Sequence, residues 1–174
     1  MVLPIRTFPD SILHSPTSPV EHITPQITQL IQAMIETMRH HPRCVGLAAP
    51  QVGSSARVAV VDVTGHPKAG KAGGLLVLIN PTILAKEQEL IQREGCLSVP
   101  DVTGNVARAS RLHIKALDAS GQSWERWVEG FEAIAVQHEV DHLDGKLFLD
   151  RIANVRTDLF QRKRYWFPGE PVRW

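Results

Sequence analysis

The stretch FEAIAVQHEVDHLDG, Phe131–Gly145, is the most informative part of the chain and raises the question of a metal site. Its apolar residues and both histidines recur at helical spacing on one face, and Gly145 is suited to end a helix. His138 and His142 lie about one turn apart, because a helix has 3.6 residues per turn and rises about 1.5 Å per residue. Two imidazoles placed in this way can converge on a single ion. The stretch therefore predicts a helix that carries a metal site.

Glu139 follows the first histidine directly and is rotated too far around the helix to join the pair. It can instead face a water molecule on the ion. A zinc-class ion lowers the pKa of such a water toward neutrality, and a nearby carboxylate can then take its proton and pass it to a leaving amine. The alternative is a helix with two core or surface histidines beside a solvated glutamate. The apolar residues around the histidines favour the metal site.

A catalytic metal ion needs a third protein ligand. The protease pattern HExxHxxGxxH does not supply it, because Phe148 stands where its last histidine would be, and after His142 only Glu170 remains, in a proline-rich tail. Two cysteines are left, Cys96 in REGCLSVP and Cys44 before GLAAPQVG, and the residues alone favour Cys96 only modestly. Either thiol could instead be a small buried hydrophobe.

The rest of the chain predicts an α+β fold. Thr24 and Pro25 form a helix start, and apolar residues at helical spacing then predict an amphipathic helix that closes before Pro42. Short β-rich runs, separated by glycine, proline and Asp-Ala-Ser-Gly turns, predict mostly antiparallel strands. These runs are RVAVVDV (57–63), LLVLINP (75–81), LHIKALD (112–118) and SWERWVEG (123–130). The glycine-rich GHPKAGKAGG (65–74) predicts a flexible surface loop.

Length and composition exclude several classes of protein. The 174 residues fit a single domain, 1–174, and 19 basic against 18 acidic residues leave no field to attract nucleic acid, so a small-molecule or peptide substrate is expected. The apolar runs are too short to span a membrane, and the start MVLPIRTFPD lacks a signal-peptide core. Two cysteines are too few for a disulfide framework. The expected location is the cytoplasm, or an organellar matrix if a presequence has been removed.

Three blocks of the chain together resemble the peptide deformylases. They are CVGLAAPQ (44–51), EGCLSVP (94–100) and QHEVDHLDG (137–145), and they occur in the order of that family. The resemblance implies a compact fold with antiparallel strands wrapped around the HEVDH helix and a terminal helix from about Arg156. It also implies Cys96, His138 and His142 as the metal ligands and Glu139 as the general acid and base, which decides between the two cysteines.

The resemblance further implies hydrolysis of the N-formyl group from nascent proteins that begin with formyl-methionine. Ferrous iron is the expected native metal, with zinc or nickel in purified protein, and the enzyme is expected to be a monomer that acts near the ribosome exit. Attack on the formyl carbon creates an oxyanion, for which Gln51 and the backbone N–H of Leu97 match the donors of the family. The expected substrate-binding residues are Val45, Gly46, Phe131, Ile134 and Ala135.

Two positions depart from the family pattern. Cys44 stands where many members have glycine, and Thr103 where many have an arginine thought to hold the substrate backbone. Catalysis is expected to survive both changes, whereas substrate affinity is less secure and Cys44 is expected to be sensitive to oxidation. One rival is another metal-dependent amidase, with a third ligand other than Cys96. A second is a non-enzymatic metal-binding domain, which would need neither Glu139 nor Gln51.

Overall fold

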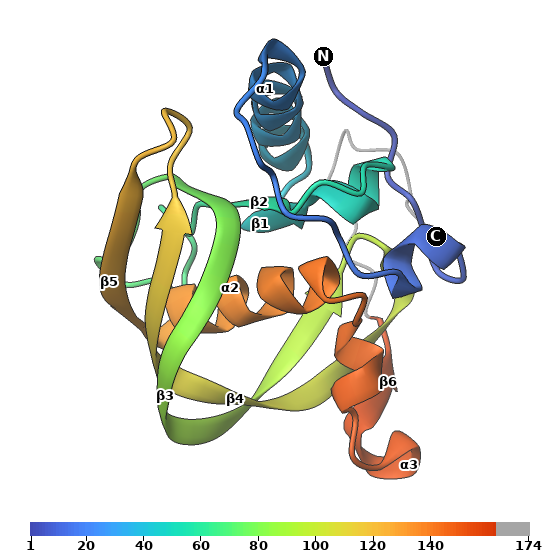
Figure 1. The fold of residues 1–174 in the computed structure, drawn as a ribbon. Helices are drawn as coiled ribbons and strands as arrows, with labels where there is room; N and C mark the ends of the chain where they lie inside the picture. Colours follow the sequence, from blue (N-terminus) through green and yellow to red (C-terminus); the bar gives the residue numbers. More distant parts are fainter. Residues whose placement is uncertain (163–174) are drawn as a thin grey trace.

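The computed structural model describes residues 1–162, and an antiparallel sheet dominates it (Figure 1). Its strands lie in the order β1-β2-β3-β4-β5, and β6 pairs with β4. The strands are β1 (Gly46–Ala48), β2 (Val58–Val61), β3 (Leu76–Cys96), β4 (Val99–Leu117), β5 (Ser123–Glu129) and β6 (Leu159–Gln161). The predicted antiparallel sheet is therefore confirmed.

Strands β3 and β4 form one hairpin that is much longer than the predicted runs. The pairing shifts register at three places, the last of them between Glu94 and Cys96. Such irregularities bend a strand and increase its twist. The bent hairpin curves past helix α2 (Gly130–Leu143), as Figure 1 shows. Its tip, where Cys96 pairs with Val99, carries the Cys96 thiol to within 3.3 Å of His142 on that helix.

Helix α1 (Pro25–His40) begins where Thr24 accepts a hydrogen bond from the Ile27 backbone N–H at 3.3 Å. A threonine cap followed by proline suits a helix start, because proline lacks an N–H that would need a partner there. One side of α1 is buried against β1 and β2, and its buried apolar residues are Ile31, Met34, Ile35 and Met38. Figure 1 shows α1 on one side of β1 and β2 and α2 on the other.

Helix α2 is buried on nearly every side, unlike α1. From Glu132 to Leu143 only His138 is partly exposed. Polar side chains in such a helix need partners. The Arg126 guanidinium donates to Glu132 at 2.8 Å, and the Gln137 amide exchanges two hydrogen bonds with the backbone of Ala109. The single apolar face predicted from the sequence therefore understates how completely the strands enclose α2.

The C-terminal part of the described chain differs from the prediction. A terminal helix from about Arg156 is wrong for these residues, because α3 (Val155–Asp158) is a single turn and the chain then enters β6. Leu159 pairs with Gly104 of β4, and it packs on a core cluster that includes Phe148. The remainder of that prediction falls on residues 163–174 and lies outside the described residues. Within residues 1–162, no helix is long and apolar enough to cross a membrane.

Candidate metal centre

Three side chains that can bind a metal converge between α2 and the tip of the β3–β4 hairpin. One ligand atom from each of Cys96, His138 and His142 lies within 4.8 Å of the others. The Cys96 thiol and His142 Nε2 are 3.3 Å apart, and the two imidazole centroids are 5.0 Å apart. Cys96 is 5 % exposed and His142 is 1 % exposed, so water is largely excluded from the group.

The thiol and the two imidazoles are electrostatically coupled, and a metal ion would displace the protons that they hold. Burial raises the pKa of the Cys96 thiol, but His142 and His138 outweigh it and hold that pKa well below its usual value. Burial lowers the pKa of His138, whereas hydrogen bonds to Cys96 and Glu94 raise it well above its usual value. A buried thiolate beside two imidazoles is a ligand set typical of a zinc-class ion with an open coordination position.

Cys44, the rival third ligand, lies outside the group of three. Its thiol donates a hydrogen bond to the Gly46 carbonyl at 3.2 Å. Burial, followed by the nearby charge of Glu139, raises the pKa of Cys44 to about 12. Because the thiolate is the reactive form, a raised pKa makes this thiol less reactive at neutral pH. The direction of the shift argues against the expected oxidation sensitivity of Cys44, which stays a prediction.

Glu139 lies beside the two histidines with a carboxylate that is 4 % exposed. Its Oε2 atom is buried and has no hydrogen-bond partner among residues 1–162. Burial is the largest influence and raises the pKa of Glu139 to about 7, although His138 and His142 act in the opposite direction. A carboxyl with a pKa near neutrality can both accept and release a proton at physiological pH.

Strand β1 passes directly over this carboxylate. A Cβ atom on Gly46 would lie 2.7 Å from Glu139 Oε1 and 2.9 Å from its Cγ. Cβ atoms essentially never make non-bonded contacts this short, so any larger residue at position 46 would displace the carboxylate. The glycine therefore fixes the space in which Glu139 lies.

The Gln51 amide points its nitrogen at the metal-binding group. Its Oε1 accepts from the Ala48 backbone N–H at 3.0 Å, so Nε2 faces Cys96 Sγ at 3.5 Å and Ser98 Oγ at 3.2 Å. Gln51 sits in the short helix η2 (Ala49–Val52), directly after β1. Leu97 follows Cys96 in the turn between β3 and β4. Ser98, which carried no signal in the sequence, is fully buried and helps to orient this amide.

The expected pocket residues are only partly brought together. Val45, Phe131 and Ala135 belong to one core cluster, whereas Ile134 is buried outside it. The glycine-rich loop also contributes, because the His66 ring stacks on Phe131 with centroids 4.4 Å apart. Ala69 and Ala72 of this loop pack against the same cluster and the loop contains several backbone turns, so the predicted flexible loop is tied to the core.

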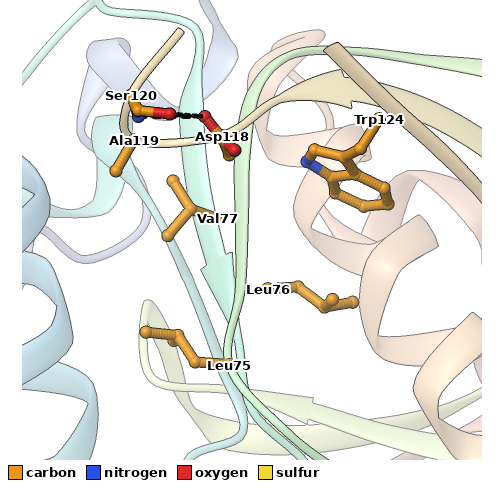
Figure 2. Close-up of a pocket in the computed structure, with 7 residues that line it drawn as sticks. All are labelled: Leu75, Leu76, Val77, Asp118, Ala119, Ser120 and Trp124. Carbon is orange, nitrogen blue, oxygen red and sulfur yellow. Dashed lines mark hydrogen bonds between the residues drawn. The ribbon is translucent and has the colours of Figure 1, made fainter. Parts of the chain in front are cut away.

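Two further features lie around the site. Figure 2 shows a pocket between the start of β3 and the β4–β5 turn, and it contains none of the predicted site residues. Its lining residues are Leu75, Leu76, Val77, Asp118, Ala119, Ser120 and Trp124. Glu94, by contrast, touches the site, since its Oε1 accepts from His138 Nδ1–H at 2.8 Å. The signal in the sequence was its position two residues before Cys96, on the same face of a strand.

Comparisons with known proteins agree with this geometry. The family model described as polypeptide deformylase matches residues 2–158. The peptide deformylase of Halothermothrix orenii is 46% identical over 158 residues, which cover 91% of this chain and 98% of that protein. The peptide deformylase structure from Legionella pneumophila has a TM-score of 0.81 at 39% identity and covers 90% of this chain and 89% of that one.

A third relative was solved with a peptide. The class I type b peptide deformylase of Acinetobacter baumannii bound to Met-Ala-Ser has a TM-score of 0.81 at 40% identity, over 87% of this chain and 99% of that one. The matches cover most of both partners in each case. The chain belongs to the peptide deformylase family of metal-dependent enzymes, whose known function is the removal of the N-formyl group from nascent peptides.

Proposed function

We propose that Cys96, His138 and His142 hold one divalent metal ion at which the chain removes the formyl group from an N-terminal formyl-methionine. The single observation that carries this proposal is the meeting of three ligand atoms within 4.8 Å, beside the unpartnered carboxylate of Glu139. The ligand set of one thiolate and two imidazoles supports a zinc-class or iron(II) ion. An ion held there supplies Lewis acidity, lowering the pKa of a water molecule and polarising the formyl carbonyl.

The residues of the chain then perform the proton transfers. Glu139 accepts a proton from the water that attacks the formyl carbon, and transfers it to the amine nitrogen as the carbon–nitrogen bond breaks and formate leaves. The Gln51 amide and the Leu97 backbone N–H donate to the oxyanion that forms during attack. The orientation of the Gln51 amide, fixed by the Ala48 N–H, supports this role because the donor is in place before the reaction.

The substrate side chain is proposed to lie near Val45, Gly46, Phe131, Ile134 and Ala135. Burial of Ile134 and Ala135 one turn before the metal ligand His138 supports an apolar pocket for methionine. The finer features of the fold fit the same proposal: the strands around the HEVDH helix keep the centre dry, and the amphipathic helix α1 supports β1 from the other side. We further propose that residues 1–174 form one catalytic domain.

The native metal is proposed to be iron(II). One thiolate cancels a positive charge of the ion and makes its water less acidic than a site with three neutral imidazoles would, so a metal that changes coordination readily is favoured. Iron-loaded enzyme should be more active than zinc-loaded enzyme and should decay in air, while nickel gives durable activity. Turnover per bound ion, measured after reloading with each metal under argon and in air, tests this choice. Equal activity of the zinc form would contradict it.

The substrates are proposed to be nascent formyl-methionyl chains, met by a monomer near the ribosome exit in the bacterial cytoplasm. The relatives are bacterial, which supports this setting. The test compares formyl-Met-Ala-Ser with acetyl-Met-Ala-Ser on one preparation whose metal content is measured. Only the formyl peptide should be hydrolysed, because a cleft walled by Gly46, the Leu97 backbone and the ligand side chains should exclude the acetyl methyl group. Comparable rates would instead identify a general amidase.

A further inference from the structure

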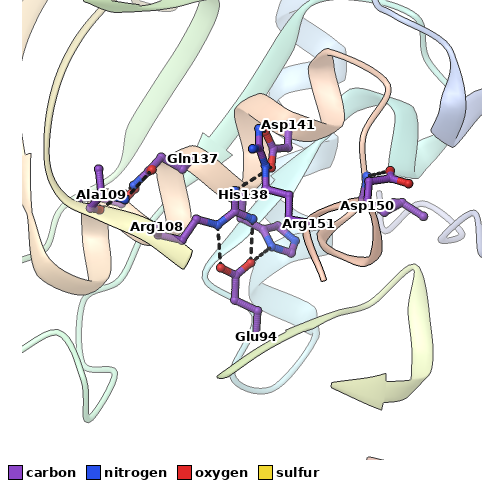
Figure 3. Close-up of polar contacts among 10 residues, drawn as sticks. Glu94, Arg108, Ala109, Gln137, His138, Asp141, Asp150 and Arg151 are labelled. Carbon is purple, nitrogen blue, oxygen red and sulfur yellow. Dashed lines mark hydrogen bonds and ion pairs between the residues drawn. The ribbon is translucent and has the colours of Figure 1, made fainter. Parts of the chain in front are cut away.

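A series of ion pairs connects the partly exposed Arg151 to the candidate metal ligand His138 (Figure 3). Arg151, on the short helix η3 (Phe148–Arg151), donates to both carboxylate oxygens of Asp141, at 2.6 and 2.8 Å. Arg108 of β4 donates to Asp141 at 2.6 Å and to both oxygens of Glu94 at 2.7 and 2.9 Å. Glu94 then accepts from His138 Nδ1–H at 2.8 Å.

This series of ion pairs has equal numbers of positive and negative groups and is almost fully buried. Its two carboxylates face two guanidiniums, and Glu94, Arg108 and Asp141 are each less than 8 % exposed. A buried charge that loses its partner is strongly destabilising, so each member depends on its neighbours. Arg108 joins the two carboxylates through all three of its guanidinium nitrogens, Nε, Nη1 and Nη2. A change at Arg151 therefore alters how Arg108 is shared between Asp141 and Glu94.

The two imidazoles of the site differ in their support. His138 is held by Glu94, whereas the Nδ1 atom of His142 is buried without a hydrogen-bond partner among residues 1–162. A carboxylate that accepts from Nδ1–H fixes the ring and leaves Nε2 with the lone pair that a metal needs. Among the two imidazoles, the protein therefore fixes the orientation of His138 by a side-chain hydrogen bond.

We propose that Arg151 and Asp141 are positioning residues for the metal site, acting through Arg108 and Glu94 on the imidazole of His138. The inference rests on the ligand assignment proposed above. Asp141 is one of the two residues between Glu139 and His142 in the HEVDH motif, and it anchors the motif to an element beyond α2. The metal affinity of the centre is thus set partly by a residue that is 36 % exposed at its side chain and touches neither metal nor substrate.

The experiment measures the dissociation constant for Zn²⁺ by competition with a chromophoric chelator, for the full chain and its variants. Arg151→Met keeps the aliphatic stem and should weaken binding about tenfold, near the lower end of the range for loss of an outer-shell partner. Arg151→Lys retains the charge without the two-pronged hydrogen bond and should fall between wild type and Arg151→Met. Glu94→Gln, next to the ligand, should weaken binding more than either.

Arg111 provides a matched control. Its side chain is also 36 % exposed and also forms charged hydrogen bonds, here with Glu87 and Glu129, and it lies on the same strand as Arg108. Arg111→Met should leave the dissociation constant unchanged, since its partners do not touch a ligand. Equal weakening by Arg111→Met and Arg151→Met would overturn the inference, because the effect would then be a general loss of charge.

A double variant separates positioning from mere stability. If Arg151 acts through Glu94, then Arg151→Met should weaken binding much less in a Glu94→Gln background than in the wild type. Additive effects, or an unchanged dissociation constant in Arg151→Met, would overturn the inference. A wild-type chain that binds no metal would instead contradict the ligand assignment, so the two failures can be told apart.

Discussion

Helices α1 and α2 are of similar length but stand in opposite relations to the sheet. Helix α1 buries one side and leaves the other to water, so the spacing of its apolar residues is visible in the sequence. Helix α2 is buried on nearly every side, and three of its polar residues, Glu132, Gln137 and Asp141, have partners on β5, β4 and η3. The pattern of apolar residues is therefore enough to identify α1, whereas the packing of α2 depends on strands that are distant in the sequence.

The largest effect is expected from removing Cys96, the proposed metal ligand that faces α2 from the β3–β4 hairpin. Cys96→Ser should lower the metal content from about one ion per chain to near zero and abolish activity, because the alcohol is a far poorer ligand than the thiolate. Metal analysis after dialysis measures this. Cys44→Ser is the control and should keep its ion; a Cys44→Ser protein without metal would show that the ligand assignment is wrong.

The next largest effect is expected from a residue of α2 that acts in catalysis without binding the metal. Glu139→Gln should retain the ion and the fold but lower kcat by roughly 10²- to 10⁴-fold, the usual contribution of a general acid and base. Single-turnover rates on formyl-Met-Ala-Ser, normalised to bound metal, provide the measurement. Near wild-type turnover in this variant would remove Glu139 from the mechanism.

The corresponding change on α1 should affect stability rather than catalysis. Met34 is fully buried, so Met34→Ala should cost about 2–5 kcal/mol of unfolding free energy. For a chain of this size that lowers the Tm by roughly 4–20 °C. Activity per folded, metal-loaded molecule should stay unchanged at low temperature. A large fall in kcat would mean that α1 contributes to catalysis as well as to stability.

Gly46 lies on β1, between the two helices, and a substitution there should affect catalysis rather than stability, like the substitutions on α2. Gly46→Ala displaces the Glu139 carboxylate, and a misplacement of about 1 Å can cost roughly 10²-fold in rate. Because the displaced group is a side chain, the unfolding free energy should change little. Rate and thermal unfolding measured on one sample test this, and a fall in Tm without a fall in rate would contradict it.

The smallest effect is expected at the exposed start of α1. Thr24→Ala removes the hydrogen bond to the Ile27 N–H and should cost about 1 kcal/mol, with unchanged metal content and activity. Denaturant unfolding with the m-value held constant measures it. A Thr24→Ser variant should recover most of the loss, since serine caps equally well.

The sequence predicted the parts of the fold whose burial follows a local pattern. The start of α1 at Thr24 and Pro25 and the run that became β2 are examples. The second half of β3, from Lys86 onward, escaped prediction because Lys86–Glu89 are exposed on both faces, and because the alternating burial that follows does not match the hydropathy: Ile91 is exposed and Glu94 is buried. Strand β6 was missed because its partner, Val102–Gly104, lies more than fifty residues earlier, beyond the reach of any local pattern.

The site could be predicted as far as its residues share a motif. The helical spacing of His138, Glu139 and His142 predicts their roles. For the third ligand, the residues alone favoured Cys96 over Cys44 only modestly, and the prediction of Cys96 rested on the three blocks in family order. Arg108 and Arg151 carried no signal, because their importance depends on distances that only the fold creates. Polar residues buried by distant strands are the part of a site that periodicity cannot show.

The close approach of β1 to Glu139 has a consequence for the evolution of resistance to inhibitors. A compound that contacts the backbone at Gly46 touches a position where every larger side chain would displace Glu139. A mutation there that blocked such a compound would also impair the enzyme, so selection could not retain it.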